Sequence, residues 1–209
     1  MIQVRMHGRG GQGVVTGAEM LSIAAFHEGR HAQAFPSFGS ERMGAPVMAF
    51  CRIDDKPIRV REPVMAPDVL VIQDSTLLHQ VDLFNGLAAD GYVLLNSRRG
   101  YDQLGIADFA RRIRPGRIVT LAATNIAVEH VGRPVPNVPL LGAFAALTGI
   151  VHLASVEAAI AAKFAGRIRD ANIAEESANL TRFNILNQSG IAALAQANQS
   201  TASVLSLLR

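Results

Sequence analysis

The chain has 209 residues, of which 49% are hydrophobic and 18% are charged, a composition typical of a soluble globular protein with one sizeable domain. Its single cysteine excludes an internal disulfide framework, and it also excludes an iron–sulfur cluster or structural zinc held by several cysteines of this chain. The net charge of +3 and an aromatic content of 5% argue against a nucleic-acid interface.

Hydrophobic periodicity predicts alternating strands and helices in the first part of the chain. The polar segment 36–45 is rich in glycine and proline and is longer than most connections, which makes it a candidate for function. In chain order, we predict a strand over 2–6, a helix over Val14–His27 that stops at Gly29, strands over 31–35 and 46–53, and a strand over 57–61 that forms a hairpin with the one before it.

The rest of the chain continues the alternation and then becomes helical. We predict strands over 68–73, 92–96 and 117–123, and helices over 75–87, 106–112, 140–151 and 155–165. Apolar stretches such as 140–147 are too short to cross a bilayer, and no export signal precedes the first strand, so we expect no membrane partner and a cytoplasmic location.

This order of elements predicts the α/β class. We expect a three-layer, Rossmann-like fold in one domain, with helices on both faces of a sheet that the 46–61 hairpin makes mixed. We assign residues 1–183 to this domain and residues 184–209 to a C-terminal tail that is helical or partly disordered.

The stretch HGRGGQG, residues 7–13, follows the first strand and precedes the first helix. Gly8, Gly10 and Gly13 have the spacing G-x-G-x-x-G, in which the backbone N–H groups at a helix N-terminus approach a phosphate. The alternative is a tight packing corner between strand and helix with no ligand. The second strand ends at Pro36 without an acidic residue for a ribose, which disfavours binding of NAD or FAD.

Four segments in order, HGRGGQGVVTGAEMLSIAAF, AFPSFGSERMGAPVMAFCRIDDKPIR, PDVLVIQD and PVPNVPLLGAFAALTG, resemble the gamma subunit of 2-oxoacid:acceptor oxidoreductases, the family of pyruvate:ferredoxin oxidoreductase. The resemblance extends from Ile2 to about Ile173. It implies a multi-subunit enzyme that oxidatively decarboxylates a 2-oxo acid to an acyl-CoA and passes electrons to ferredoxin or another acceptor. In that family, thiamine diphosphate with magnesium and the iron–sulfur clusters are held by the alpha, beta and iron–sulfur subunits, and the gamma subunit helps to bind coenzyme A.

The resemblance suggests contacts to coenzyme A from two loops and one asparagine. Arg9 is a cation beside a helix N-terminus, which is unfavourable without an anion or carboxylate nearby, and Gln12 contacts the ligand or caps the next turn. Arg42 reaches a phosphate, or pairs with Glu41 on a solvated loop. Asn137 follows a strand end, where ligands gather, or serves a turn. The candidate ligand-binding residues are Gly8, Arg9, Gly10, Gly11, Gln12, Gly13, Ser40, Glu41, Arg42 and Asn137.

Two other functions stay open at this point. The chain is a purely structural assembly subunit, with coenzyme A held by other chains, or it is a stand-alone nucleotide-binding oxidoreductase. The missing acidic residue and the missing nucleophile–base pair argue against the second, and we assign no catalytic residue and no metal ligand. The 2-oxo acid itself, whether pyruvate, a branched-chain acid, 2-oxoglutarate or an aryl glyoxylate, is not specified by this chain.

Overall fold

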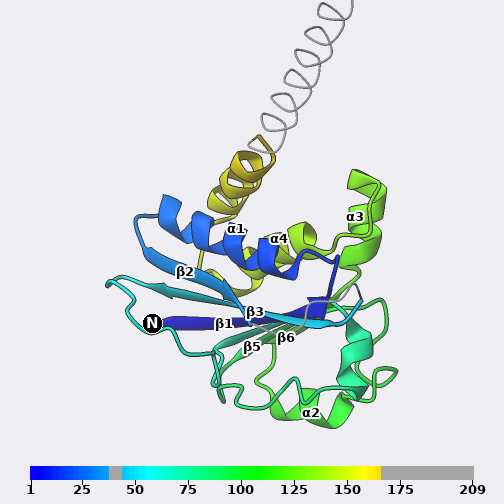
Figure 1. Cartoon of the computed structure of the whole chain (residues 1–209). Helices are drawn as coiled ribbons and strands as arrows, with labels where there is room; N and C mark the ends of the chain where they lie inside the picture. The colour runs from blue at the N-terminus through cyan, green and yellow to red at the C-terminus, as the bar shows by residue number, and fades with distance from the viewer. Residues whose placement is uncertain (38–43, 166–209) are drawn as a thin grey trace, which may run out of the picture. The chain divides into compact units, whose positions relative to one another are not determined.

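A six-stranded sheet runs through the middle of the computed structural model, which describes residues 1–37 and 44–165 (Figure 1). The strand order is β2-β3-β1-β4-β5-β6. β1, β4, β5 and β6 are parallel, whereas β3 is antiparallel to both β1 and β2, so the predicted mixed sheet is confirmed. The strands are β1 (Ile2–Arg9), β2 (His31–Pro36), β3 (Pro46–Asp54), β4 (Val69–Ile72), β5 (Tyr92–Asn96) and β6 (Ile118–Leu121).

The antiparallel part of the sheet differs from the predicted hairpin. Residues 57–61 form no strand, and β3 pairs instead with β2 on one side and with β1 on the other. Because both edges of β3 are hydrogen-bonded in this way, a third partner has no free edge to pair with. The predicted hairpin over 46–61 is therefore wrong, and the mixed character of the sheet comes from β3, which runs antiparallel to its neighbours β1 and β2.

Helices cover both faces of the sheet, which confirms the predicted three layers. α1 (Val14–His27) and α4 (Asn137–Thr148) lie on one face, and α2 (Ala107–Arg112) lies on the other with the short 3₁₀ helix η1 (Ser75–His79). Successive β4 side chains point to opposite faces, so Val69 and Val71 join the core under α1 and α4 while Leu70 and Ile72 join the core under η1 and α2. Each such buried side chain stabilises the fold by about 1.5–3 kcal/mol.

α1 has the predicted bounds. Its end depends on Gly29, which has φ +76 and donates its N–H to the Phe26 carbonyl at 2.9 Å. A left-handed glycine just past the last turn satisfies a carbonyl that would otherwise have no partner. α2 also matches its prediction to within one residue.

Three predicted helices have the wrong bounds, and one further helix was not predicted. The helix predicted over 75–87 is only η1, because the carbonyls of Leu83 and Asn85 accept hydrogen bonds from the Arg5 guanidinium of β1 and Gly86 has φ +75. α3 (Ala123–Val131) was not predicted; its first residue lies within the strand predicted over 117–123, whereas β6 ends at Leu121. α4 begins at Asn137 rather than at residue 140, and the next helix begins at Leu153 rather than at residue 155.

Residues Met1–Ala162 form one compact unit. The predicted boundary between residues 183 and 184, the tail 184–209 and the candidate residues Ser40, Glu41 and Arg42 lie outside the described residues. Within the described ranges, no helix is both long and apolar enough to cross a membrane.

Candidate functional site

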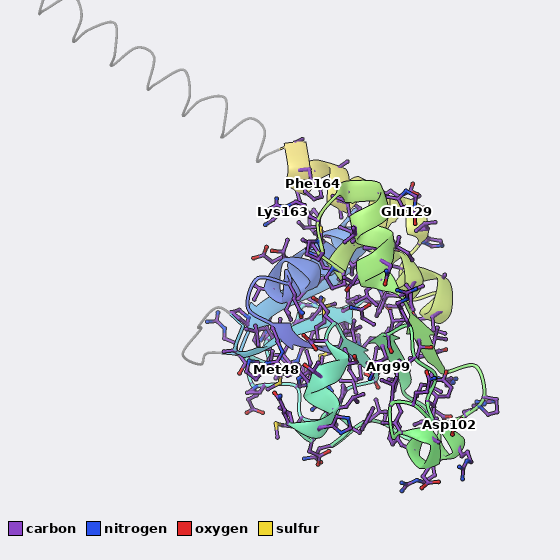
Figure 2. All side chains as sticks on the ribbon, turned by 90° about the vertical axis from the view of Figure 1, so that its right-hand side faces the viewer. Met48, Arg99, Asp102, Glu129, Lys163 and Phe164 are labelled. Atoms are coloured by element: carbon purple, nitrogen blue, oxygen red, sulfur yellow. The ribbon has the colours of Figure 1, made fainter. Side chains whose placement is uncertain are left out.

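The glycine loop lies at the carboxyl end of β1, where the connections that leave β1 and its neighbour β4 go to opposite faces of the sheet. β1 is followed by α1 on one face of the sheet, while its parallel neighbour β4 is followed by η1 on the other face. In open α/β sheets, ligands bind in the crevice outside the carboxyl ends of strands at such a point. Figure 2 views the molecule from this side and labels Met48, which pairs with His7 of β1, and Arg99, which follows β5.

Two glycines of the loop are required by close packing. β1 extends to Arg9, three residues further than predicted, so Gly8 lies within the strand, where an added Cβ would stand 2.6 Å from Val14 Cγ2 and 2.9 Å from Gln12 Oε1. Gly13 caps α1 with φ +73, and an added Cβ there would stand 2.5 Å from Asn137 Nδ2. These contacts support the interpretation of the loop as a packing corner.

Gly11 has space beside it that no described atom fills, whereas the N–H groups of its neighbours Gly10 and Gln12 are hydrogen-bonded within the chain. Gly11 has φ +94, and an added Cβ would meet nothing within 4 Å among the described residues. Gly10 donates its N–H to the Ala45 carbonyl at 3.0 Å, and Gln12 donates its N–H to the Arg9 carbonyl at 3.1 Å.

The start of α1 presents backbone N–H groups that are available as hydrogen-bond donors. No described residue accepts a hydrogen bond from the N–H groups of Gly11, Gly13, Val14 or Val15. The first turn of α1 also contains no acidic residue, and its N-cap provides no side-chain acceptor. The positive end of the helix dipole is therefore uncompensated by this part of the chain, which is the arrangement that attracts a phosphate.

Arg9 is held by the chain itself. Its Nε lies 3.3 Å from Asp74 Oδ2, its Nη1 donates to the Gly44 carbonyl at 3.0 Å, and its Nη2 donates to Thr76 Oγ1 at 2.8 Å and to Gln80 Oε1 at 3.0 Å. The sequence analysis expected an anion or a carboxylate beside Arg9. Asp74 supplies this carboxylate. All three guanidinium nitrogens have partners, so Arg9 needs no external anion to be stable.

Gln12 links the loop to Asp74. Its Oε1 accepts the Arg9 backbone N–H at 2.8 Å, and its Nε2 donates to Asp74 Oδ2 at 2.8 Å. Burial acts to raise the pKa of Asp74, but hydrogen bonds from Thr76 and Gln12 and the charge of Arg9 together hold that pKa below its usual value. The Gln12 side chain therefore shapes the loop instead of pointing away from it.

Asn137 meets the glycine loop, although it does not follow a strand end, since α3 lies between β6 and the start of α4 at Asn137. Its Nδ2 donates to the Gly13 carbonyl at 3.2 Å, its Oδ1 accepts the Val138 N–H at 2.9 Å, and the residue is 4% exposed. The first residue of α4 and the N-cap of α1 are thus fastened together. The predicted residues that the structure describes, 8–13 and 137, all lie at this one point.

Sequence reasoning missed Gln73 and Asp74. Gln73 is 1% exposed, its Oε1 has no partner among the described residues, and its Cβ would be 3.1 Å from a Cβ at Gly8. Both residues directly follow β4, and the strand-end rule that pointed to Asn137 applies to them as well.

His7 is a buried base on the face of β1 opposite α1. It is 5% exposed, and its Nε2 has no hydrogen-bond partner within the described residues. Arg5 shares its face because alternate residues of a strand point the same way. Burial, and then the positive charge of Arg5, lower the pKa of His7 from 6.5 to about 4, so the imidazole is neutral at neutral pH.

We expect this histidine to make stability depend on pH. The unfolded chain takes up its proton near pH 6.5 and the folded chain only near pH 4, so the free energy of unfolding falls as the pH drops between these values, by about 3 kcal/mol in total. Urea unfolding from pH 7 to pH 4 measures this slope. His7→Gln removes it, whereas replacement of the exposed His130 by Gln keeps it; an equal slope in both variants would contradict the assignment.

Comparisons with known proteins agree on a family. The family model described as pyruvate ferredoxin/flavodoxin oxidoreductase matches residues 3–200. The pyruvate/ketoisovalerate oxidoreductases common subunit gamma of Thermococcus kodakarensis is 46% identical over 183 residues, which cover 87% of this chain and 97% of that protein.

Solved structures extend the likeness to the fold. The pyruvate oxidoreductase subunit PORC (EC 1.2.7.1) of Thermotoga maritima is 37% identical with a TM-score of 0.65, covering 78% of this chain and 84% of that one. The 2-oxoglutarate:ferredoxin oxidoreductase of Magnetococcus marinus, solved with 2-oxoglutarate, coenzyme A and succinyl-CoA bound, is similar in fold at 16% identity and a TM-score of 0.59, over 79% of this chain and 27% of that one. The chain belongs to the pyruvate ferredoxin/flavodoxin oxidoreductase family and corresponds to its gamma subunits.

Proposed function

We propose that this chain, a gamma subunit of a multi-subunit 2-oxoacid oxidoreductase, contributes to the coenzyme A site of its complex through the glycine loop at the start of α1. The observation that carries the proposal is the set of N–H groups at Gly11, Gly13, Val14 and Val15, which have no acceptor among the described residues and lie at the point where α/β sheets bind ligands. Coenzyme A is an anion with a diphosphate, and a helix N-terminus without an acidic first turn favours such a group.

The proposal changes the part that we assign to the two side chains of the loop. Arg9 and Gln12 already have partners in Asp74, Thr76 and Gln80, so we give the phosphate contact to the backbone and not to the Arg9 guanidinium. An added Cβ at Gly11 would meet no atom of residues 1–37 or 44–165 within 4 Å, so these residues leave room for a ligand at the loop. The coenzyme A bound in the Magnetococcus marinus enzyme supports the choice of ligand.

The other cofactors belong, in this proposal, to partner chains. Residues 1–37 and 44–165 contain no group of three or more His, Cys, Asp or Glu residues that could hold a metal ion. We assign thiamine diphosphate with magnesium and the iron–sulfur clusters to alpha, beta and iron–sulfur subunits, and electron transfer to ferredoxin or another acceptor to the same chains. The cytoplasmic location stays a prediction.

A structural assembly subunit is the second candidate function. It is favoured by the close contacts of Gly8 and Gly13, which explain two glycines of the motif by packing alone. In that case coenzyme A is bound by other chains, and the free N–H groups of α1 face a partner subunit.

Hydrogen exchange of the assembled complex distinguishes the two candidates. We expect saturating coenzyme A to slow exchange of the N–H groups of Gly11, Gly13, Val14 and Val15 at least tenfold, because a phosphate would accept hydrogen bonds from them. Pantetheine, which has the thiol arm but no phosphate, should leave their exchange unchanged. Equal exchange with and without coenzyme A would contradict the proposed contact and favour the assembly subunit.

A further inference from the structure

Asp74 contacts polar groups at the end of β1 and polar groups that follow β4. It is the N-cap of η1, where its Oδ1 accepts the Thr76 N–H at 2.9 Å and the Thr76 hydroxyl at 2.6 Å. Its Oδ2 accepts from Gln12 Nε2 at 2.8 Å and lies 3.3 Å from Arg9 Nε. One carboxylate, with its side chain 15% exposed, therefore joins the glycine loop to the end of β4.

Besides Asp74, the loop is held at Gly10 by hydrogen bonds with residues 44 and 45 and at Gly13 by Asn137. Glycine has no side chain to pack and loses more conformational freedom on ordering than any other residue. Between Gly10 and Gly13, the backbone N–H groups of only Gly10 and Gln12 have acceptors among the described residues. Gln12 joins the loop to Asp74 by a hydrogen bond, and the Arg9 guanidinium joins it to the same carboxylate by an ion pair.

We propose that Asp74 is a positioning residue: through Gln12 and Arg9 it fixes the glycine loop in the conformation that keeps the N–H groups of Gly11, Gly13 and the first turn of α1 free for a phosphate. The phosphate in this inference rests on the proposed function, whereas the fixing of the loop does not. Asp74 itself touches no ligand.

The chemistry of the contacts requires a carboxylate at this position. Gln12 Nε2 donates to one oxygen of residue 74, and the Thr76 N–H and hydroxyl donate to the other, so both oxygens must accept. Arg9 Nε donates to Thr76 Oγ1 and lies 3.3 Å from Asp74 Oδ2 as an ion pair. An asparagine offers one acceptor and one donor, and in either orientation it turns a donor toward another donor. It also leaves the charge of Arg9 without a counter-charge in the loop.

Swapping the carboxylate of residue 74 and the amide of residue 12 across their 2.8 Å contact tests the inference in the assembled complex. Asp74→Asn should speed exchange of the loop N–H groups at Gly10 and Gln12 without coenzyme A, and should raise KM for coenzyme A about tenfold. The value of kcat at saturating coenzyme A should stay unchanged, because the proposed contact is to a phosphate and its loss weakens binding alone. Gln12→Glu alone should behave similarly, since it places two carboxylates in contact.

The double variant Asp74→Asn with Gln12→Glu should recover most of the wild-type exchange and KM. The new carboxylate at position 12 can accept the Arg9 N–H with one oxygen and the new amide of position 74 with the other. The matched control is Asp102→Asn, at an exposed aspartate labelled in Figure 2 that follows β5; it should change neither quantity.

The outcomes separate this inference from the proposed function. Unchanged loop exchange in Asp74→Asn, or a double variant no better than its parents, overturns the positioning role. Faster exchange with an unchanged KM supports the positioning role and contradicts the phosphate contact instead. Should Asp74→Asn fail to assemble, Gln12→Ala removes the bridge while Asp74 stays on Thr76, and unchanged loop exchange in that variant overturns the inference equally.

Discussion

Gly13→Ala should raise KM for coenzyme A of the assembled complex by roughly a hundredfold. Residue 13 has φ +73, a conformation that costs a residue with a Cβ about 1–2 kcal/mol, and the new Cβ would stand 2.5 Å from Asn137 Nδ2. The loop or α4 must therefore shift, and a displacement of about 1 Å at a binding site costs on the order of a hundredfold. The steps that precede coenzyme A should keep their rate, because only binding is lost.

Gly29→Ala is the matched control for this experiment. Gly29 has nearly the same φ, +76, at the opposite end of α1, and its added Cβ would meet no described atom within 4 Å. It should therefore show the cost of the backbone conformation without the displaced loop. Steady-state kinetics with varied coenzyme A measure both variants; equal KM values would mean that Gly13 acts only through the stability of α1.

The sequence predicts the strands and α1 well because their signals are local. The continuous apolar run of β4 and the helical spacing between Val14 and His27 depend only on residues close in the chain. The failed hairpin shows where local signals end. Residues 57–61 are compatible with a strand, but the edge that they needed belongs to β1, more than forty residues earlier.

The candidate site likewise has parts that local sequence signals predict and parts that depend on residues distant in the chain. The glycine loop carries its own pattern, whereas Asn137 was predicted to follow a strand end and in the structure begins α4, with α3 between it and β6. Asp74 carries no local pattern, because its contacts to Gln12 and Arg9 join residues 62 and 65 positions apart, and only the pairing of β1 with β4 brings them together. The charge of Arg9, which suggested an external anion, is balanced by this distant carboxylate.

A distant cation likewise explains why the segment after η1 is not helical. Arg5 is 6% exposed, and its Nη2 donates to the carbonyls of Leu83 at 2.9 Å and Asn85 at 2.6 Å. Its Nη1 lies 3.4 Å from the carbonyls of Val64 and Met65. The Arg5 guanidinium of β1 thus holds two segments of irregular backbone, because it donates hydrogen bonds to their carbonyl groups. Burial lowers the pKa of Arg5, and nearby Asp82 acts in the opposite direction.

Arg5→Met should lower the free energy of unfolding by on the order of 3 kcal/mol. Methionine keeps much of the apolar stem but leaves the carbonyls of Leu83 and Asn85 without their donor, and an unsatisfied buried polar group costs about 1–3 kcal/mol. Urea unfolding followed by circular dichroism measures the loss, with Arg61→Met at an exposed arginine as the matched control. Amide exchange over residues 81–87 should accelerate in Arg5→Met alone, because this guanidinium is what fixes that segment to the sheet. A loss no larger than that of Arg61→Met would mean that the two segments are held by their apolar contacts, Leu83 above all, and not by the cation.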